Sequence, residues 1–201
     1  SSDVCSSDLY GKNNRFYGFV YDDRNANGVI DGPETPLQGF QINAGAASYS
    51  TNVPVDIPDF NGTNGIAISP ITVPAGGSTI TDVNVQINVT HTFDADLVLY
   101  LIAPDNTTIT LSANNGGSGD NYTDTVFDDS AATDIAAGSS PFTGTYRPTQ
   151  PLSTFNGLNT SGLWQLRVED TAAIDTGTIL NWSISFNSTQ QAVSDSNGWA
   201  L

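Results

Sequence analysis

The sequence predicts an all-β protein whose main part is a β-sandwich. Many short runs alternate apolar and polar residues at a period of two, as half-buried strands do. The stretches between these runs are rich in Gly, Ser, Thr, Asn and Asp, the residues of turns. Signals for regular helices are nearly absent, and the apolar residues suffice for a core.

Strand signals follow one another regularly from Val53 onward. Ile66 to Val73 form one candidate strand, which we expect Pro70 to interrupt. Val83 to His91 alternate cleanly, which predicts a strand with one buried face. Leu97 to Ile102 are apolar on both faces, as in a central strand, and Thr107 to Leu111 form its return strand.

Two further strands close the pattern, at Gly162 to Asp170 and at Gly177 to Phe186. Trp164 and Trp182 alternate with polar neighbours, so both indoles are predicted to lie in the core rather than on a sugar-binding platform. Leu180 is expected on the same face as Trp182. Because the gap between the strands is short, we expect them to form an antiparallel pair.

Residues 23–34 match the twelve-residue calcium loop of EF-hand proteins at every ligand position. Gly28 occupies the position of the sharp turn. The flanking residues favour strands rather than helices, and the alternative is a polar turn between two strands. The expected Ca²⁺ ligands are Asp23, Asn25, Asn27, Val29 (through its carbonyl), Asp31 and Glu34.

The formal net charge of −16 excludes nucleic acid as a favoured partner, because binding it requires many Lys and Arg residues. No apolar stretch approaches the ~20 residues that span a bilayer, so membrane insertion is not expected. Carboxylates near strand ends could form a second calcium site, or could merely cap turns and face solvent. The candidates for this second site are Asp94, Asp96, Asp120, Asn121, Asp128 and Asp129.

Catalytic residues are not predicted. The sole histidine, His91, continues the apolar face of a strand, so a hydrogen-bonded structural role is expected. No Gly-x-Ser-x-Gly or His-Glu-x-x-His motif is present. The adjacent acids Asp128-Asp129 and Glu169-Asp170 point to opposite faces if extended, which disfavours glycosidase chemistry. Asp170 and Asp175 are expected to hold the last turn through hydrogen bonds.

In order and spacing, the motifs of residues 53–187 resemble the P domain, also called Homo B, of proprotein convertases and secreted bacterial subtilisin-like proteases. The resemblance implies a jelly-roll fold and a non-catalytic domain that supports folding, stability or substrate engagement of a protease. One departure is that the family usually has Gly or Ser just before the Asp-Leu pair, whereas this chain has Asp94-Ala95-Asp96. The motifs are His91-Thr92, Asp96-Leu97, Leu101 to Asp105, Gly116 to Asn121, Phe127 to Asp129, Pro141 to Pro148, and the two tryptophan strands.

The remaining segments divide the chain further. Residues 10–43 contain a stretch that resembles the SdrD B-like calcium-binding domains of bacterial adhesins. Residues 1–9 resemble a translated sequencing adapter, so we expect Cys5 not to be native. Residues 44–52 are expected to be a linker, and residues 188–201 a polar tail or the start of a linker.

These features together predict an accessory domain of a secreted or cell-surface, calcium-dependent protein that contains several domains. Its expected partners are adjacent domains of the same polypeptide, with a subtilisin-like serine endopeptidase domain foremost. Two alternatives remain: adhesion or assembly in a bacterial surface protein, and a carbohydrate-binding jelly roll.

Overall fold

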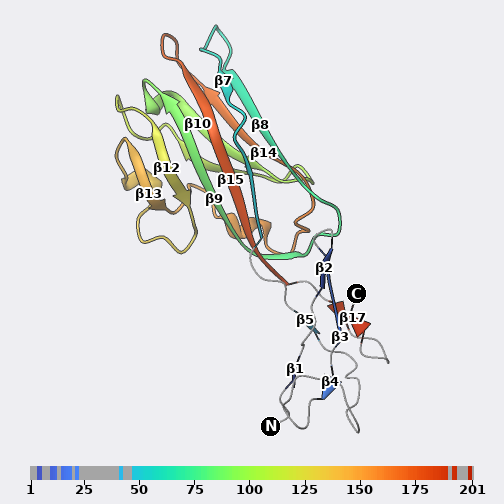
Figure 1. The fold of residues 1–201 in the computed structure, drawn as a ribbon. Helices are drawn as coiled ribbons and strands as arrows, with labels where there is room; N and C mark the ends of the chain where they lie inside the picture. Colours follow the sequence, from blue (N-terminus) through green and yellow to red (C-terminus); the bar gives the residue numbers. More distant parts are fainter. Residues whose placement is uncertain are drawn as a thin grey trace. The chain divides into compact units, whose positions relative to one another are not determined.

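The computed structural model describes residues 47–189 and seven short strands outside this range (Figure 1). The chain divides into two compact units, one of residues 46–188 and one of residues 1–45 with 189–201. The short strands are β1 (Val4–Cys5), β2 (Tyr10–Lys12), β3 (Arg15–Phe19), β4 (Tyr21–Asp22), β5 (Gln41–Ile42), β16 (Ala192–Val193) and β17 (Trp199–Ala200). In these, β1 pairs with β4, β16 with β5, and β3 with both β2 and β17.

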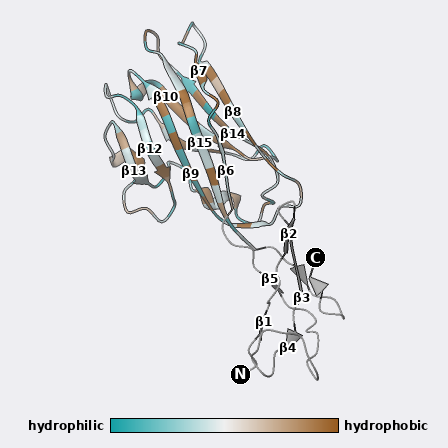
Figure 2. Ribbon diagram, in the orientation of Figure 1, coloured by the Kyte–Doolittle hydropathy of each residue, from teal (hydrophilic) through white to brown (hydrophobic). Residues whose placement is uncertain are grey.

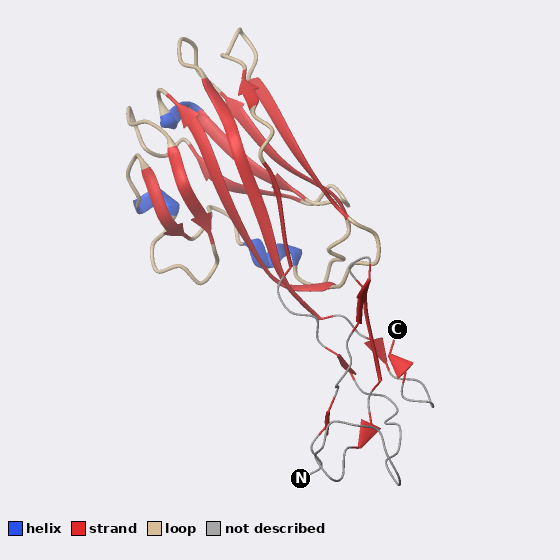
Figure 3. Cartoon of the chain, in the orientation of Figure 1, coloured by secondary structure: helices blue, strands red, loops and turns tan. Residues whose placement is uncertain are grey.

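The unit of residues 46–188 is a two-layer β-sandwich with three short 3₁₀ helices (Figure 3), which confirms the predicted fold class. Its strands are β6 (Ala47–Thr51), β7 (Val55–Ile57), β8 (Gly65–Val73), β9 (Thr79–His91), β10 (Leu97–Ile102), β11 (Thr108–Ala113), β12 (Tyr122–Phe127), β13 (Phe142–Tyr146), β14 (Gly162–Asp170) and β15 (Gly177–Thr189). Its helices are η1 (Asp94–Asp96), η2 (Ile135–Ala137) and η3 (Leu152–Phe155).

One sheet has four antiparallel strands in the order β11-β10-β14-β8. The other has the order β13-β12-β9-β15-β6, and β7 also pairs with β15. Among the described strand pairs, that of β12 with β13 alone is parallel. The predicted alternation of β9 and the central place of β10 are both confirmed.

The core between the sheets is built on the two predicted tryptophans, which are 0% and 1% exposed. The Trp164 ring contacts Phe155 and Phe186, each with a centroid separation of 5.2 Å. Each indole also donates a hydrogen bond, from Trp164 Nε1 to the Thr160 carbonyl and from Trp182 Nε1 to Ser69 Oγ. Buried aromatic rings whose N–H groups are satisfied stabilise the sandwich without an unpaired donor.

The expectation that the two tryptophan strands pair with each other was wrong. β14 lies between β10 and β8, whereas β15 lies in the other sheet beside β9. The short connection between them therefore crosses from one layer to the other, and the tryptophans approach the core from opposite sides. Leu180 does not share the inward face of Trp182 as expected: it is 40% exposed, and Ile179 is buried instead. The alternation shifts here because β15 changes partner from β7 to β6 between Ile179 and Trp182.

Two other expectations are corrected at the edges of the sheets. Pro70 does not interrupt its strand, because β8 is an edge strand, where a missing N–H can face away from the ladder. Residues 47–51, expected within a linker, form β6 against β15. The small polar residues there carry little strand signal, and pairing with β15, with Tyr49 packed near Phe186, stabilises the strand.

Candidate functional site

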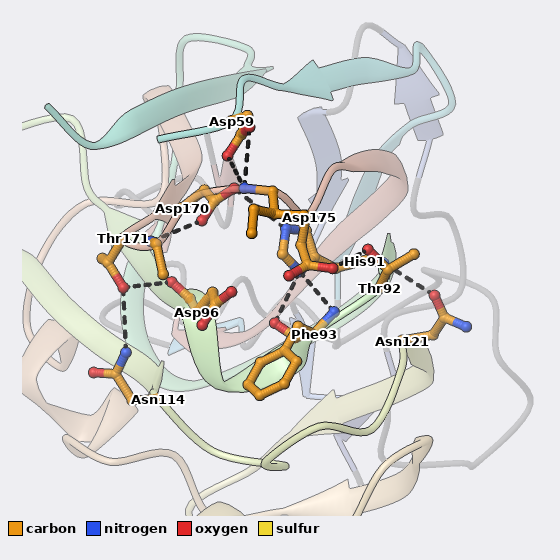
Figure 4. A network of polar contacts seen from close by, with 12 residues as sticks. Asp59, His91, Thr92, Phe93, Asp96, Asn114, Asn121, Asp170, Thr171 and Asp175 are labelled. Carbon is orange, nitrogen blue, oxygen red and sulfur yellow. Dashed lines mark hydrogen bonds and ion pairs between the residues drawn. The ribbon is translucent and has the colours of Figure 1, made fainter. Parts of the chain in front are cut away.

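A polar network lies where β9, η1 and β14 meet the turn before β15 (Figure 4). We call it the His91 cluster. It contains His91, Asp59, Asp96, Asp170 and Asp175.

His91 is buried in this cluster, as its place on the apolar face of β9 predicts. Its Nδ1 atom lies 2.9 Å from the carbonyl oxygen of Phe93, and the Phe93 N–H lies 3.2 Å from the same nitrogen. Its Nε2 atom faces Asp170 Oδ2 at 3.4 Å, and both side chains are 0% exposed. The ring is thus enclosed by protein groups, which fits the expected structural role.

Asp170 links the end of β14 to the turn that follows. Its Oδ1 atom accepts the N–H of Ala172 at 3.1 Å, the turn-type hydrogen bond that the sequence predicted. Asp175 behaves differently from the prediction, because its carboxylate accepts the hydroxyl of Thr92 at 2.8 Å, across the gap to the β9 end. These two carboxylates therefore hold the turn by one local and one long-range contact.

The Asp96 side chain contributes negative charge to the cluster, and its backbone carbonyl contributes hydrogen bonds. Its backbone carbonyl accepts both the N–H and the hydroxyl of Thr171, at 2.9 and 2.7 Å. Partial burial raises the pKa of its carboxyl, and repulsion from Asp170 and then Asp175 raises it further. The Asp59 carboxylate approaches from the loop before β8 and accepts the N–H of Ile174.

The structure does not gather the six candidates for a second calcium site into one place. Asp94 and Asp96 lie in η1, where Asp94 is buried and Asp96 half-buried. Asp94 accepts the N–H of Asn121 at 2.9 Å and the hydroxyl of Ser140 at 2.5 Å. Burial raises the pKa of its carboxyl, and these two hydrogen bonds offset part of that rise.

The other candidates also bind protein groups. Asn121 Oδ1 accepts the N–H of His91, and this hydrogen bond joins the loop before β12 to the end of β9. Asp128 accepts the N–H of Ser130, and Asp129 accepts the first two N–H groups of η3. Asp120 lies near enough to Asp94 to raise the pKa of that carboxyl. Among the residues that the structure describes, no three His, Cys, Asp or Glu side chains are grouped closely enough to hold a metal ion.

The predicted calcium loop at residues 23–34 lies outside the described residues, so its ligand set stays a prediction. In the described part of the chain, no helix is long and apolar enough to cross a membrane.

Sequence reasoning missed the contact between His91 and Asp170. Each of the two residues ends a strand in which buried and less buried positions alternate, and each continues the inward face of its strand. That pattern was the signal available in the sequence. What the sequence could not show is that β9 and β14 belong to different sheets and end at the same edge of the sandwich.

The family model described as "Proprotein convertase P-domain" matches residues 80–186, more than half of the chain. The chain belongs to the proprotein convertase P-domain family. The match runs from β9 through β15 and includes most of the His91 cluster, Asp59 excepted. The resemblance to P domains is therefore confirmed, and the matched residues belong to the two-layer sandwich.

Relatives of this P domain include two Streptomyces proteins. The leupeptin-inactivating enzyme 1 of Streptomyces exfoliatus is 32% identical over 82% of this chain, and the transglutaminase-activating metalloprotease of Streptomyces mobaraensis is 28% identical over 71%. The chain spans only 31% and 15% of these relatives. Among solved structures, the serine protease of Aeromonas sobria in complex with its chaperone matches with a TM-score of 0.45 and 16% identity, over 75% of this chain and 28% of that one.

Proposed function

We propose that this chain is a non-catalytic accessory domain of a secreted protease that contains several domains. The observation that carries the proposal is the P-domain match over residues 80–186, together with relatives that extend far beyond the matched part, one of which is named as a metalloprotease. The sandwich contributes a scaffold: its sole histidine is buried, and its tryptophans fill the core. The proposed role is to support the folding, stability and substrate engagement of the neighbouring catalytic domain.

The finer proposal is a subtilisin-like serine endopeptidase as that neighbour. Its support is the family itself, whose description names the proprotein convertases. One relative is named as a metalloprotease, so the P domain also accompanies another catalytic type. Completing the reading frame tests this directly: a subtilisin-like domain supports the proposal, whereas a metalloprotease domain replaces its finer part.

We also propose calcium dependence, which rests on the oxygen ligands at EF-hand spacing in residues 23–34. Asp23 and Glu34 occupy the first and last positions of that loop. The proposal is separable from the protease proposal, because it concerns a different segment of the chain.

The experiment for the main proposal is a peptidase assay with two samples. The purified 201-residue chain is expected to leave peptide substrates intact, and the complete polypeptide is expected to cleave them. Cleavage by the chain alone, surviving a second purification, would contradict an accessory role. Repeated adhesin domains in place of a protease would point instead to adhesion or assembly.

A further inference from the structure

The sheet that contains β9 and β15 presents side-chain amides and hydroxyls on its outward face. Buried and outward residues alternate along β9, and Figure 2 shows the corresponding alternation of hydrophobic and hydrophilic residues. On the adjacent strand β15, Trp182, Ile184 and Phe186 are buried, so the residues between them face outward. We define the amide face as Asn84, Gln86, Asn88, Asn181, Ser183 and Ser185.

Hydrogen bonds between neighbouring strands hold side chains of this face in place. Asn88 Nδ2 lies 3.0 Å from Asn181 Oδ1 on β15 and 3.0 Å from Asp124 Oδ1 on β12, and donates to both. Asn88 Oδ1 accepts the Asp124 N–H at 2.7 Å, and the Ser185 hydroxyl donates to the backbone carbonyl of Asn84 at 3.4 Å. Side chains that are already held lose little conformational freedom when a ligand binds. The amide face is therefore prepared to bind a partner through hydrogen bonds.

The charge on this part of the sheet is low and of one sign. At the outward positions of β6, of β9 and of residues 181–187 in β15, Asp82 is the sole charged residue. An ordinary soluble surface carries charged side chains at roughly a quarter to a third of its positions. These three strands contain no Lys or Arg, so a phosphate or sulfate group would meet no cation here.

The composition of the amide face also disfavours a protein partner. Its six residues are Asn, Gln and Ser, whereas protein interfaces place aromatic and apolar side chains at their centre. A second copy of the chain is disfavoured as well, because two chains of formal charge −16 repel each other.

A neutral polysaccharide has the chemistry that matches this face. Each sugar hydroxyl both donates and accepts hydrogen bonds, as carboxamides and Ser hydroxyls do. Neighbouring strands lie about 4.8 Å apart, and outward residues follow one another about 6.8 Å apart along a strand. The six side chains thus form a grid of donors and acceptors, and a neutral ligand is not repelled by the acidic chain.

We propose that the amide face binds a neutral polysaccharide. This role goes beyond the proposed function: it keeps the chain, with any catalytic domain joined to it, on a polysaccharide surface. The site is not a tryptophan platform, because Trp164 and Trp182 are both in the core. Since neutral hydrogen bonds each contribute modestly, we expect a Kd of about 1 mM.

The test is native gel electrophoresis of the 201-residue chain in gels that contain hydroxyethyl cellulose, mixed-linkage β-glucan or galactomannan. Binding predicts that at least one of these neutral polymers slows the chain relative to a reference protein. Gln86→Ala combined with Asn181→Ala removes two amides and leaves the net charge unchanged. It should weaken binding about tenfold, measured as the polymer concentration that gives half of the maximal retardation. Gln86→Ala alone, at an exposed position, is the second variant in case the double variant does not fold.

Gln165→Ala is the matched control, because Gln165 is a half-buried amide on β14 of the other sheet. It should leave the retardation unchanged. The proposal is overturned if none of the three polymers retards the chain, if the double variant is retarded as strongly, or if the control variant loses as much. Light scattering that shows a dimer of the chain, but not of the double variant, would assign the face to a second copy and overturn it too. None of these results bears on peptidase activity, so the proposed function is tested separately.

Discussion

Replacing Asp170 by Ala tests whether the buried pair with His91 holds this edge of the sandwich. Both side chains are 0% exposed, with Nε2 and Oδ2 3.4 Å apart. The substitution leaves the His91 nitrogen without its facing carboxylate and the Ala172 N–H without its acceptor. A partly buried N–H left without its acceptor costs about 1–3 kcal/mol, and loss of the carboxylate beside the buried imidazole adds to that cost.

The expected loss of unfolding free energy is therefore about 2–5 kcal/mol. For a unit of this size, a loss of about 3 kcal/mol lowers the Tm by roughly 6–12 °C. Thermal unfolding followed by circular dichroism measures this. Asp105→Ala is the control: Asp105 is exposed and accepts hydrogen bonds from Thr107, its neighbour in the turn, so its replacement should lower the Tm much less than that of Asp170.

A double variant isolates the pair itself. If His91 and Asp170 stabilise each other, then His91→Ala combined with Asp170→Ala should cost at least about 1 kcal/mol less than the sum of the single changes. Additive single effects, or an Asp170→Ala loss no larger than that of Asp105→Ala, would refute the reasoning.

Three further outcomes are expected. Burial and neighbouring carboxylates raise the pKa of Asp96, so its ionisation lowers the stability of the folded state as pH rises through that pKa. Asp96→Asn should therefore raise the free energy of unfolding by about 0.5–1 kcal/mol at pH 7. Urea titrations should show no such gain at a pH where the carboxyl is protonated in both the folded and the unfolded state. Trp164→Ala should cost about 3–5 kcal/mol by emptying the core between the sheets, measured as a lower urea midpoint at unchanged slope. Calorimetry should give a higher Tm in Ca²⁺ than in chelator, and Asp23→Ala with Glu34→Ala should shrink that difference, whereas an unchanged Tm with chelator would refute calcium binding.

The alternation of apolar and polar residues predicted the strands of the sandwich well where the burial of one face alone determines which residue types are used. The strict alternation of β9 and the buried places of Trp164 and Trp182 follow from one face of each strand meeting the core. Such patterns identify a strand and its inward face, because they depend only on neighbouring residues.

Pairing could not be predicted in the same way. The six residues between Asp170 and Gly177 are compatible with a tight hairpin, yet here they connect strands of opposite sheets. The contact of His91 with Asp170 depends on that crossing, so the inward faces of the two strands did not suffice to predict it. The carboxylates of Asp94 and Asp129 were candidate cation ligands, but each accepts two hydrogen bonds from segments distant in sequence.

The most direct test of an accessory role is the rate of thermal inactivation of the complete polypeptide, with and without residues 46–188. Peptidase activity followed over time at elevated temperature gives the half-life of each form. A supporting P domain predicts that the shortened form is active when fresh and loses activity faster than the complete form. Equal half-lives and equal substrate kinetics for the two forms would contradict that role.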